Sequence, residues 1–137
     1  MPKLSAASQA RLNGAHPSLK KLFTAVAETE DITILDGQRG KEAQEKAFSE
    51  GHSRAHFGQS AHNWAPALAL DVCPYPIDWK DIPRFVALSK VVKAKAKELG
   101  VDITYGGDWK SIKDYPHYEL SDWKALSKTN IVRPYAG

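Results

Sequence analysis

The chain contains a single cysteine, Cys73, among 137 residues. One cysteine can form no internal disulfide and cannot build a zinc site of the four-cysteine type. An apolar core must therefore hold the fold, and hydrophobic residues make up 42% of the chain, an ordinary share for a globular protein. A chain of this length buries about two-thirds of the surface that its unfolded form exposes, so it needs no covalent staple. We expect Cys73 itself to be a small buried residue.

The overall charge and hydropathy patterns exclude several classes of protein. The formal net charge is +3, from 19 basic and 16 acidic residues, and so mild a charge indicates no particular partner. No apolar run approaches the ~20 residues of a membrane-spanning helix. The first sixteen residues lack the apolar segment of a secretory signal. We therefore expect one domain over residues 1–137, with neither an export signal nor a membrane anchor.

Apolar spacing and turn residues predict the elements of an α+β fold. Helices are expected over 5–13, 17–29, 41–50 and 85–99, the last two closed by Gly51 and Gly100. Strands are expected over 31–35, 67–72, 101–105 and 115–120. Because helices and strands do not alternate regularly, a small antiparallel sheet flanked by helices is favoured over a parallel one.

Polar residues interrupt this pattern around the predicted strand 67–72. The stretch before it, 52–66, is a long polar loop with three histidines, and long loops in compact domains are often functional. Within the strand, Leu68, Leu70 and Val72 share one face. The other face carries two alanines and Asp71, which leaves room beside the carboxylate for a ligand.

His62, Asp71 and His117 form a candidate metal site. Two imidazoles and one carboxylate can bind zinc and leave one coordination position open, as in catalytic zinc sites. If the strands that carry Asp71 and His117 pair, both side chains can face one cleft. Each histidine taken alone is more simply a hydrogen-bonded structural or surface residue, and Asp71 could instead cap a turn before Pro74.

Two further residues could act beside such a site. Asp114 precedes His117 by three residues and could serve as a general base and then protonate a leaving amine. Arg39 lies in a loop bracketed by glycines and could hold a carboxylate or polarise a carbonyl oxygen. The plainer interpretations are a turn residue ahead of Pro116 for Asp114 and a salt-bridging surface residue for Arg39. We expect the remaining histidines, His16, His52 and His56, at the surface, and the tryptophans 64, 79, 109 and 123 mostly in the core or in cleft walls.

The ordered motifs resemble a known enzyme family. Ser60-Ala-His62, Ala69-Leu-Asp71 and Asp114-Tyr-Pro-His117 are similar to the motifs of the zinc D-Ala-D-Ala carboxypeptidase and L-alanyl-D-glutamate peptidase family. That family includes VanX- and VanY-type enzymes and phage endolysins, and it shares its fold with the hedgehog signalling domain. Asp36-Gly-Gln-Arg39, Gln44 and Gly106-Gly-Asp-Trp109 also match family segments in the same order, so the resemblance spans roughly residues 30–120.

The resemblance implies a role for each of these residues. His62, Asp71 and His117 would be the zinc ligands, and Asp114 the catalytic acid and base. Arg39 would bind substrate near the scissile carbonyl, with Ser60 and Gln44 also contacting the substrate, while Glu119 would at most orient a metal ligand. One departure stands out: Asp71 follows His62 by nine residues where the common pattern has seven, and the usual intervening glycine is absent.

The function that the resemblance implies is that of a phage endolysin. It would be a zinc-dependent L-alanyl-D-glutamate endopeptidase of one catalytic domain without a cell-wall-binding module, cleaving peptidoglycan stem peptides for host lysis. We expect a monomer that collects in the host cytoplasm and reaches the wall through a holin-made lesion. A D,D-carboxypeptidase or dipeptidase releasing D-Ala is the alternative enzyme, and a non-catalytic binding domain on the same scaffold is the alternative of another class. The balanced charge, with no basic stripe, argues against nucleic acid as a partner.

Overall fold

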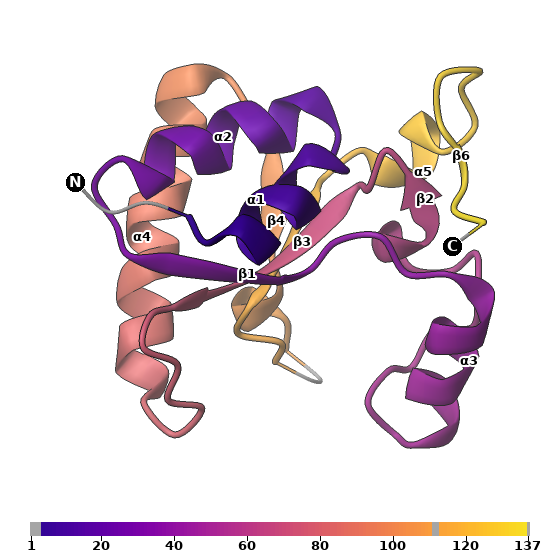
Figure 1. Cartoon of the computed structure of the whole chain (residues 1–137), viewed down its shortest axis with the longest axis horizontal. Helices are drawn as coiled ribbons and strands as arrows, with labels where there is room; N and C mark the ends of the chain where they lie inside the picture. The colour runs from indigo at the N-terminus through magenta and orange to yellow at the C-terminus, as the bar shows by residue number, and fades with distance from the viewer. Residues whose placement is uncertain (1–3, 111–112, 137) are drawn as a thin grey trace.

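A four-stranded antiparallel sheet forms the centre of the molecule (Figure 1). The computed structural model describes residues 4–110 and 113–136. The strands are β1 (Ile32–Asp36), β3 (Ala69–Pro74), β4 (Ile103–Tyr105) and β5 (His117–Leu120), in the order β1-β3-β5-β4. This confirms the predicted α+β class with a small antiparallel sheet. The strand expected over 67–72 is displaced by two residues, because Ala67 and Leu68 donate their N–H groups to Gly14 and Ala61 outside the sheet.

Within the described residues, five α-helices accompany the sheet, and each of the four predicted from sequence is present. They are α1 (Ala6–Asn13), α2 (Pro17–Ala27), α3 (Lys41–Ser49), α4 (Ile82–Leu99) and the short α5 (Trp123–Leu126). Helix α4 begins three residues earlier than expected because the Asp81 side chain accepts from the N–H of Arg84 and Pro83 lies in the first turn. It ends where predicted, at Gly100, whose φ of +72° suits glycine.

The two faces of the sheet have different roles, and strand pairing determines which side chains lie on each. Leu70 of β3 lies opposite Tyr118 of β5, and both are fully buried. They pack with apolar residues of α1, α2 and α4 in one core. Asp71 lies opposite His117, and Ala69 opposite Glu119, so these polar side chains project from the other face. The predicted division of the strand into an apolar and a polar face is confirmed.

The polar face is bordered by a segment that folds without much regular structure. Between α3 and β3, the chain forms the 3-10 helix η1 (Ala61–Asn63) and the two-residue strand β2 (Trp64–Ala65). Strand β2 pairs with β6 (Arg133–Pro134) in a separate two-stranded sheet. A second 3-10 helix, η2 (Gly106–Asp108), follows β4. Across the described ranges, no helix combines the length and apolarity needed to span a bilayer.

Candidate active site

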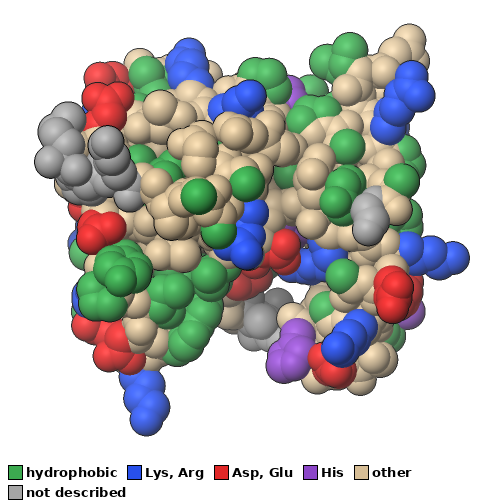
Figure 2. Space-filling model, in the orientation of Figure 1, with side chains coloured by type: hydrophobic (Ala, Val, Ile, Leu, Met, Phe, Trp, Pro, Cys, Tyr) green, Lys and Arg blue, Asp and Glu red, His purple; other side chains and the backbone are tan. Residues whose placement is uncertain are grey.

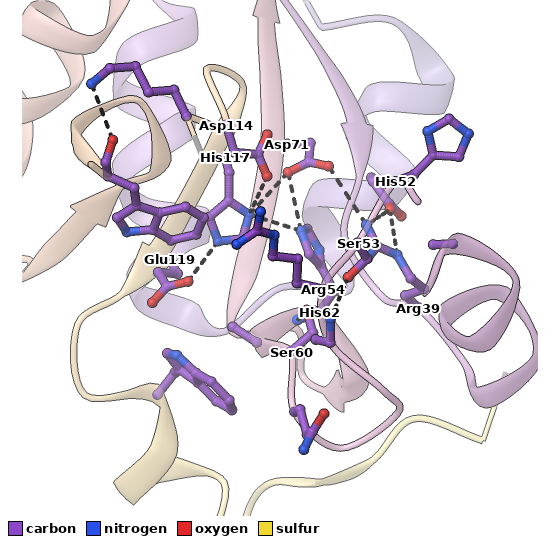
Figure 3. A pocket seen from close by; sticks show the side chains of 18 of the residues that line it. Arg39, His52, Ser53, Arg54, Ser60, His62, Asp71, Asp114, His117 and Glu119 are labelled. Atoms are coloured by element: carbon purple, nitrogen blue, oxygen red, sulfur yellow. Dashed lines mark hydrogen bonds and ion pairs between the residues drawn. The ribbon is translucent and has the colours of Figure 1, made fainter. Parts of the chain in front are cut away.

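An open pocket of about 730 Å³ lies over the polar face of the sheet. It is lined from β3 and β5 by Asp71, His117 and Glu119, and from η1 by His62. The other lining residues come from the end of β1 and the loop after it, from α3 and the loop after it, from η1, from the loop before β5 and from α5. Figure 2 shows the molecule hollowed between the α3 region and the main body, with acidic and basic side chains gathered at the edge. Figure 3 shows His62, Asp71, Asp114 and His117 pointing toward one another, whereas the ring of His52 points away from them.

His62, Asp71 and His117 meet at the bottom of the pocket. Nε2 of His62 lies 3.2 Å from Oδ1 of Asp71 and 3.2 Å from Nδ1 of His117. The same His117 nitrogen lies 3.3 Å from Oδ1 of Asp71. In the part of the chain that the structure describes, these residues are the one group of three with the arrangement needed to hold a metal ion. Pairing of β3 with β5 supplies two of the donors, and His62 reaches them from η1.

Hydrogen bonds at the far side of each ring orient both imidazoles. Nδ1 of His62 lies 2.7 Å from the carbonyl oxygen of Gly37, and Nε2 of His117 lies 2.7 Å from Oε1 of Glu119. Both partners can only accept a hydrogen bond, so the ring proton of each imidazole lies on the nitrogen that faces its partner. The remaining ring nitrogens then present lone pairs toward each other and toward Asp71. Three lone-pair donors this close together need a cation between them, either a proton or a metal ion.

The charges and hydrogen bonds around Asp71 and His117 favour a positive charge between these two side chains. Burial alone would raise the pKa of Asp71, but His62 and His117 hold it far below its ordinary value. For His117, burial lowers the pKa, and hydrogen bonds to Asp71 and Glu119 outweigh that effect and raise it to about 9. Without a metal, His117 therefore keeps an extra proton at neutral pH, which stands in the place of a metal cation.

Asp114 faces the same centre from the turn that leads into β5. Its Oδ2 lies 4.0 Å from Nδ1 of His117, close enough for a water molecule between the carboxylate and the donor group. Burial, followed by the nearby negative charge of Asp71, raises the pKa of Asp114. Its side chain remains 43% exposed, so a substrate can reach it.

Gly106 sets the position of Asp114. The N–H of Asp114 donates to the carbonyl oxygen of Gly106 at 3.0 Å. A Cβ at residue 106 would collide with the backbone oxygen of Asp114 and lie 2.9 Å from Cβ of His117. Glycine is therefore required for η2 to pack this closely against the turn. The family segment Gly106-Gly-Asp-Trp109 was the sequence signal at this point, although its physical role was not evident from sequence.

Arg39 lies beside Asp71 and is fixed on several sides. Its Nε and Nη2 donate to Oδ2 of Asp36 at 3.1 and 2.7 Å, and its Nη1 donates to Oε1 of Gln44 at 3.0 Å. Nη2 also lies 3.9 Å from Oδ2 of Asp71. A guanidinium has five N–H groups, so one on each Nη remains for a substrate in the pocket.

Gln44 is fully buried and lies behind Arg39, outside the pocket lining. Its Oε1 accepts from Arg39 and from Nδ2 of Asn63 at 3.1 Å. Its Nε2 donates to Oγ of Ser53 at 3.0 Å and to the carbonyl oxygen of Ala55 at 2.6 Å. The structure thus gives Gln44 contacts with the residues that shape the pocket and no open path to a substrate. The substrate contact expected of it is not provided by this arrangement.

Asn63 organises the loop that carries His62, a role that sequence reasoning missed and that only its place next to this histidine could have indicated. Its Oδ1 accepts from the N–H groups of Gly58 and Ser60 at 2.9 and 3.1 Å. Its Nδ2 donates to the carbonyl oxygen of Arg39 at 3.1 Å. Ser60 lines the pocket and caps η1, where its Oγ accepts from the N–H of His62 at 3.2 Å.

The other residues considered from sequence lie as follows. Cys73 is buried, as expected, and burial together with nearby Asp71 raises the pKa of its thiol to about 12. His52 and His56 are exposed, whereas His16 is half-buried and accepts from the N–H of Ser18 at the start of α2. Trp109 and Trp123 line the pocket. Trp79 is 59% exposed, so the expectation of a core or cleft position is wrong for it.

A group that could hold a metal ion, a neighbouring carboxylate and an anchored guanidinium in one open pocket form an arrangement suited to hydrolysis. Residues 1–125 match the family model of the phage L-alanyl-D-glutamate peptidases. The chain belongs to this family, which confirms the predicted resemblance and the predicted class of enzyme, a peptidase of the L-Ala–D-Glu type.

Individual relatives agree with this assignment. The L-alanyl-D-glutamate peptidase of Escherichia phage T5 is 30% identical over 118 residues, which are 82% of this chain and 85% of that protein. The peptidoglycan L-alanyl-D-glutamate endopeptidase CwlK of Bacillus subtilis (strain 168) is 30% identical over 109 residues, covering 66% of this chain and 60% of CwlK. The crystal structure of the Serratia marcescens L-Ala D-Glu endopeptidase ChiX has a TM-score of 0.77 and 25% identity, over 90% of this chain and 93% of ChiX.

Proposed function

We propose that this chain is a zinc-dependent endopeptidase that cleaves the L-Ala–D-Glu bond of peptidoglycan stem peptides, and that it acts as a phage endolysin in host lysis. The observation that carries the proposal is the convergence of His62, Asp71 and His117, with Asp114 placed 4.0 Å from one of the donor atoms. Family membership supports the peptide substrate, and the pocket is large enough for an extended peptide.

The donor set fits zinc by its chemistry and by its spacing. Two imidazole nitrogens and one carboxylate oxygen are ligands that zinc accepts, with a fourth position left open in catalytic sites. Four ligands at about 2.0–2.1 Å from zinc lie roughly 3.3 Å apart in a tetrahedron. The three donor atoms here lie 3.2, 3.2 and 3.3 Å apart. His62, Asp71 and His117 would therefore hold the ion with little rearrangement.

Bound zinc would supply a Lewis acid that activates water and polarises the scissile carbonyl. Asp114 would accept the proton of the attacking water and pass it to the nitrogen of the leaving amine. Its raised pKa suits both steps, because an acid–base group works best when its pKa approaches the working pH. Glu119 would keep the His117 ring oriented throughout, through the hydrogen bond of 2.7 Å at its Nε2.

Arg39 would bind the carbonyl oxygen of the residue before the scissile bond. Its N–H groups not used by Asp36 and Gln44 lie next to Asp71 at the edge of the donor group. Negative charge develops on that oxygen as water adds, and a guanidinium held in advance stabilises it without having to reorient. The ion pair with Asp36, 2.7 Å long, keeps Arg39 in this position.

The test is digestion of purified peptidoglycan by the zinc-loaded protein, with the released fragments identified by mass. Cleavage between L-Ala and D-Glu releases peptides that begin with D-Glu, and these are the expected products. Free D-Ala as the main product would favour the D,D-carboxypeptidase alternative instead. Metal analysis of His62→Ala should show loss of zinc, and turbidity of outer-membrane-permeabilised Gram-negative cells should fall only with the wild-type protein. Zinc binding with no release of any fragment would favour a non-catalytic binding domain.

A further inference from the structure

The pocket is lined by a second arginine, Arg54, to which the mechanism above gives no role. It lies in the loop between α3 and η1, and its side chain is exposed. Figure 3 shows Arg54 extending from this loop into the pocket, toward the side that carries His117 and Asp114. Among the residues that the structure describes, no ion pair or hydrogen bond is formed by its guanidinium.

The other arginine and the lysine of the pocket lining, Arg39 and Lys113, already form hydrogen bonds within the protein. Arg39 is bonded to Asp36 and Gln44. Nζ of Lys113 donates to the carbonyl oxygens of Gly107 and Trp109, both at 3.2 Å. Arg54 is therefore the lining arginine whose guanidinium has all its N–H groups open to a ligand, whereas Arg39 has one left on each Nη.

The backbone on both sides of Arg54 is held by a buried side chain. Nε2 of Gln44 donates to Oγ of Ser53 and to the carbonyl oxygen of Ala55, the two neighbours of Arg54. The same Ser53 oxygen accepts from the N–H of Ala55 at 3.1 Å. Because Oε1 of Gln44 also accepts from Arg39, one buried amide fixes the loops of both arginines. These bonds hold the two neighbours of Arg54, and with them its backbone, beside the pocket.

The carboxylates of the pocket would repel an acidic substrate group that faced them without a cation beside it. Four carboxylates line the pocket: Asp36, Asp71, Asp114 and Glu119. A glutamate residue has two carboxyl groups, and only one of them continues a peptide chain. An L-Ala–D-Glu substrate therefore brings a free carboxylate within a few bonds of the scissile amide. A guanidinium binds a carboxylate through two parallel N–H···O bonds.

We propose that Arg54 binds the free carboxylate of the glutamate residue on the leaving side of the scissile bond, and so determines specificity for an acidic residue there. This inference rests on the proposed function, because it takes the L-Ala–D-Glu bond as the one cleaved. Arg39 binds the carbonyl side of that bond and Arg54 the amine side, with Gln44 connecting their loops.

The experiment compares two synthetic stem peptides that differ only in whether this glutamate carboxylate is free or is a carboxamide. The zinc-loaded wild-type protein should cleave the free acid with a kcat/KM about tenfold to a hundredfold higher. Arg54→Gln should lose that factor on the free acid while its kcat/KM on the carboxamide stays unchanged. Arg54→Lys should restore part of the preference, because a lysine keeps the charge but not the paired N–H groups.

Lys90→Gln is the matched control, since it removes one positive charge from an exposed position on α4 outside the pocket. It should leave both kcat/KM values at the wild-type level. Equal losses on both peptides in Arg54→Gln, or an undiminished preference for the free acid, would overturn the role of Arg54 and leave the proposed function standing. If the wild-type protein cleaves neither peptide at the L-Ala–D-Glu bond, the proposed function fails and this inference fails with it.

Discussion

Glu119 and His117 lie two residues apart on β5, and Oε1 of Glu119 accepts a hydrogen bond of 2.7 Å from Nε2 of His117. Successive side chains alternate along a strand, so this spacing places the carboxylate behind the ring, on the same face. The opposite ring nitrogen of His117 is left to face Asp71. A strand of four residues thus carries both a candidate metal ligand and the group that orients it.

Removal of the Glu119 carboxylate should weaken zinc binding. Glu119→Ala leaves the His117 ring free to rotate and to change tautomer, and the loss of such a partner typically costs about 10–100-fold in metal affinity. Competition with a chromophoric chelator measures the change. Glu28→Ala removes an exposed acid at the end of α2 and should bind zinc as the wild type does. An unchanged affinity in Glu119→Ala would argue against His117 as a ligand.

Replacing Asp114 with asparagine should separate catalysis from metal binding. The amide has nearly the same size but cannot take up a proton, so turnover should fall by about 10²–10⁴-fold. Zinc content should stay at the wild-type value, because Asp114 is not one of the three donors. Asp102→Asn, at an exposed position before β4, is the control for loss of one negative charge. Wild-type turnover in Asp114→Asn would refute the acid–base role.

Zinc affinity should rise with pH. In the metal-free protein, burial lowers the pKa of His117, but its bonds to Asp71 and Glu119 raise it to about 9. Below that pH a metal ion must displace the extra proton, so binding tightens by about tenfold per pH unit and levels off above pH 9. Titration in weakly buffered solution near pH 7 should release about one proton per ion from this group. A zinc affinity that stays constant between pH 6.5 and 8.5 would show that His117 carries no extra proton in the metal-free protein.

Gln44→Leu should reduce both stability and turnover. The substitution leaves Nη1 of Arg39 and the carbonyl oxygen of Ala55 without their hydrogen-bond partner and takes one of two acceptors from Nδ2 of Asn63. Leaving buried polar groups unpaired costs about 1–3 kcal/mol, which urea denaturation can measure. Gln9→Leu is the control, since Gln9 bonds Asn13 on the exposed face of α1 and should change stability by less than about 0.5 kcal/mol. A stable Gln44→Leu with full activity would show that the network does not position Arg39.

Gly106→Ala should lower activity by displacing Asp114, while His62, Asp71 and His117 all remain in the chain. The added Cβ would press on the backbone of Asp114 and on Cβ of His117, and the turn would have to move. Steady-state kinetics and thermal unfolding should both register the displacement. Gly14→Ala is the matched control, because its Cβ meets only the flexible end of the Gln38 side chain. Equal behaviour of the two variants would show that the turn tolerates the shift.

Local sequence signals were sufficient for most of the fold. Asn13-Gly14 predicted the end of α1 and Pro17 the start of α2, and the structure places both boundaries within two residues of these positions. Gly100 ends α4, as predicted. The alternation around Asp71 correctly divided β3 into two faces. The two-residue strands β2 and β6 were not predicted, because a pair so short leaves no periodic pattern, and its partners lie far apart in sequence.

The candidate site shows where sequence patterns stop being informative. Pairing of the strands brings Asp71 opposite His117, as the sequence suggested it could. The positions of Gln44 and Asn63 depend on side-chain hydrogen bonds that join α3, η1 and the loop of Arg39, which are distant in the chain. A glutamine near an arginine is as compatible with a substrate contact as with a buried support. Only the three-dimensional packing distinguishes these two roles.

The way His62 is held has a consequence for insertions and deletions. Its ring is tethered to Gly37, and η1 is tethered through Asn63 to Arg39, so its position does not depend on a fixed count of residues to Asp71. The chain after His62 forms β2, which pairs with β6 outside the pocket lining. Variants that lengthen or shorten residues 64–66 should thus alter the β2–β6 pair and leave His62, Asp71 and His117 together. A single residue gained or lost between His117 and Glu119 would turn the carboxylate to the opposite side of the sheet.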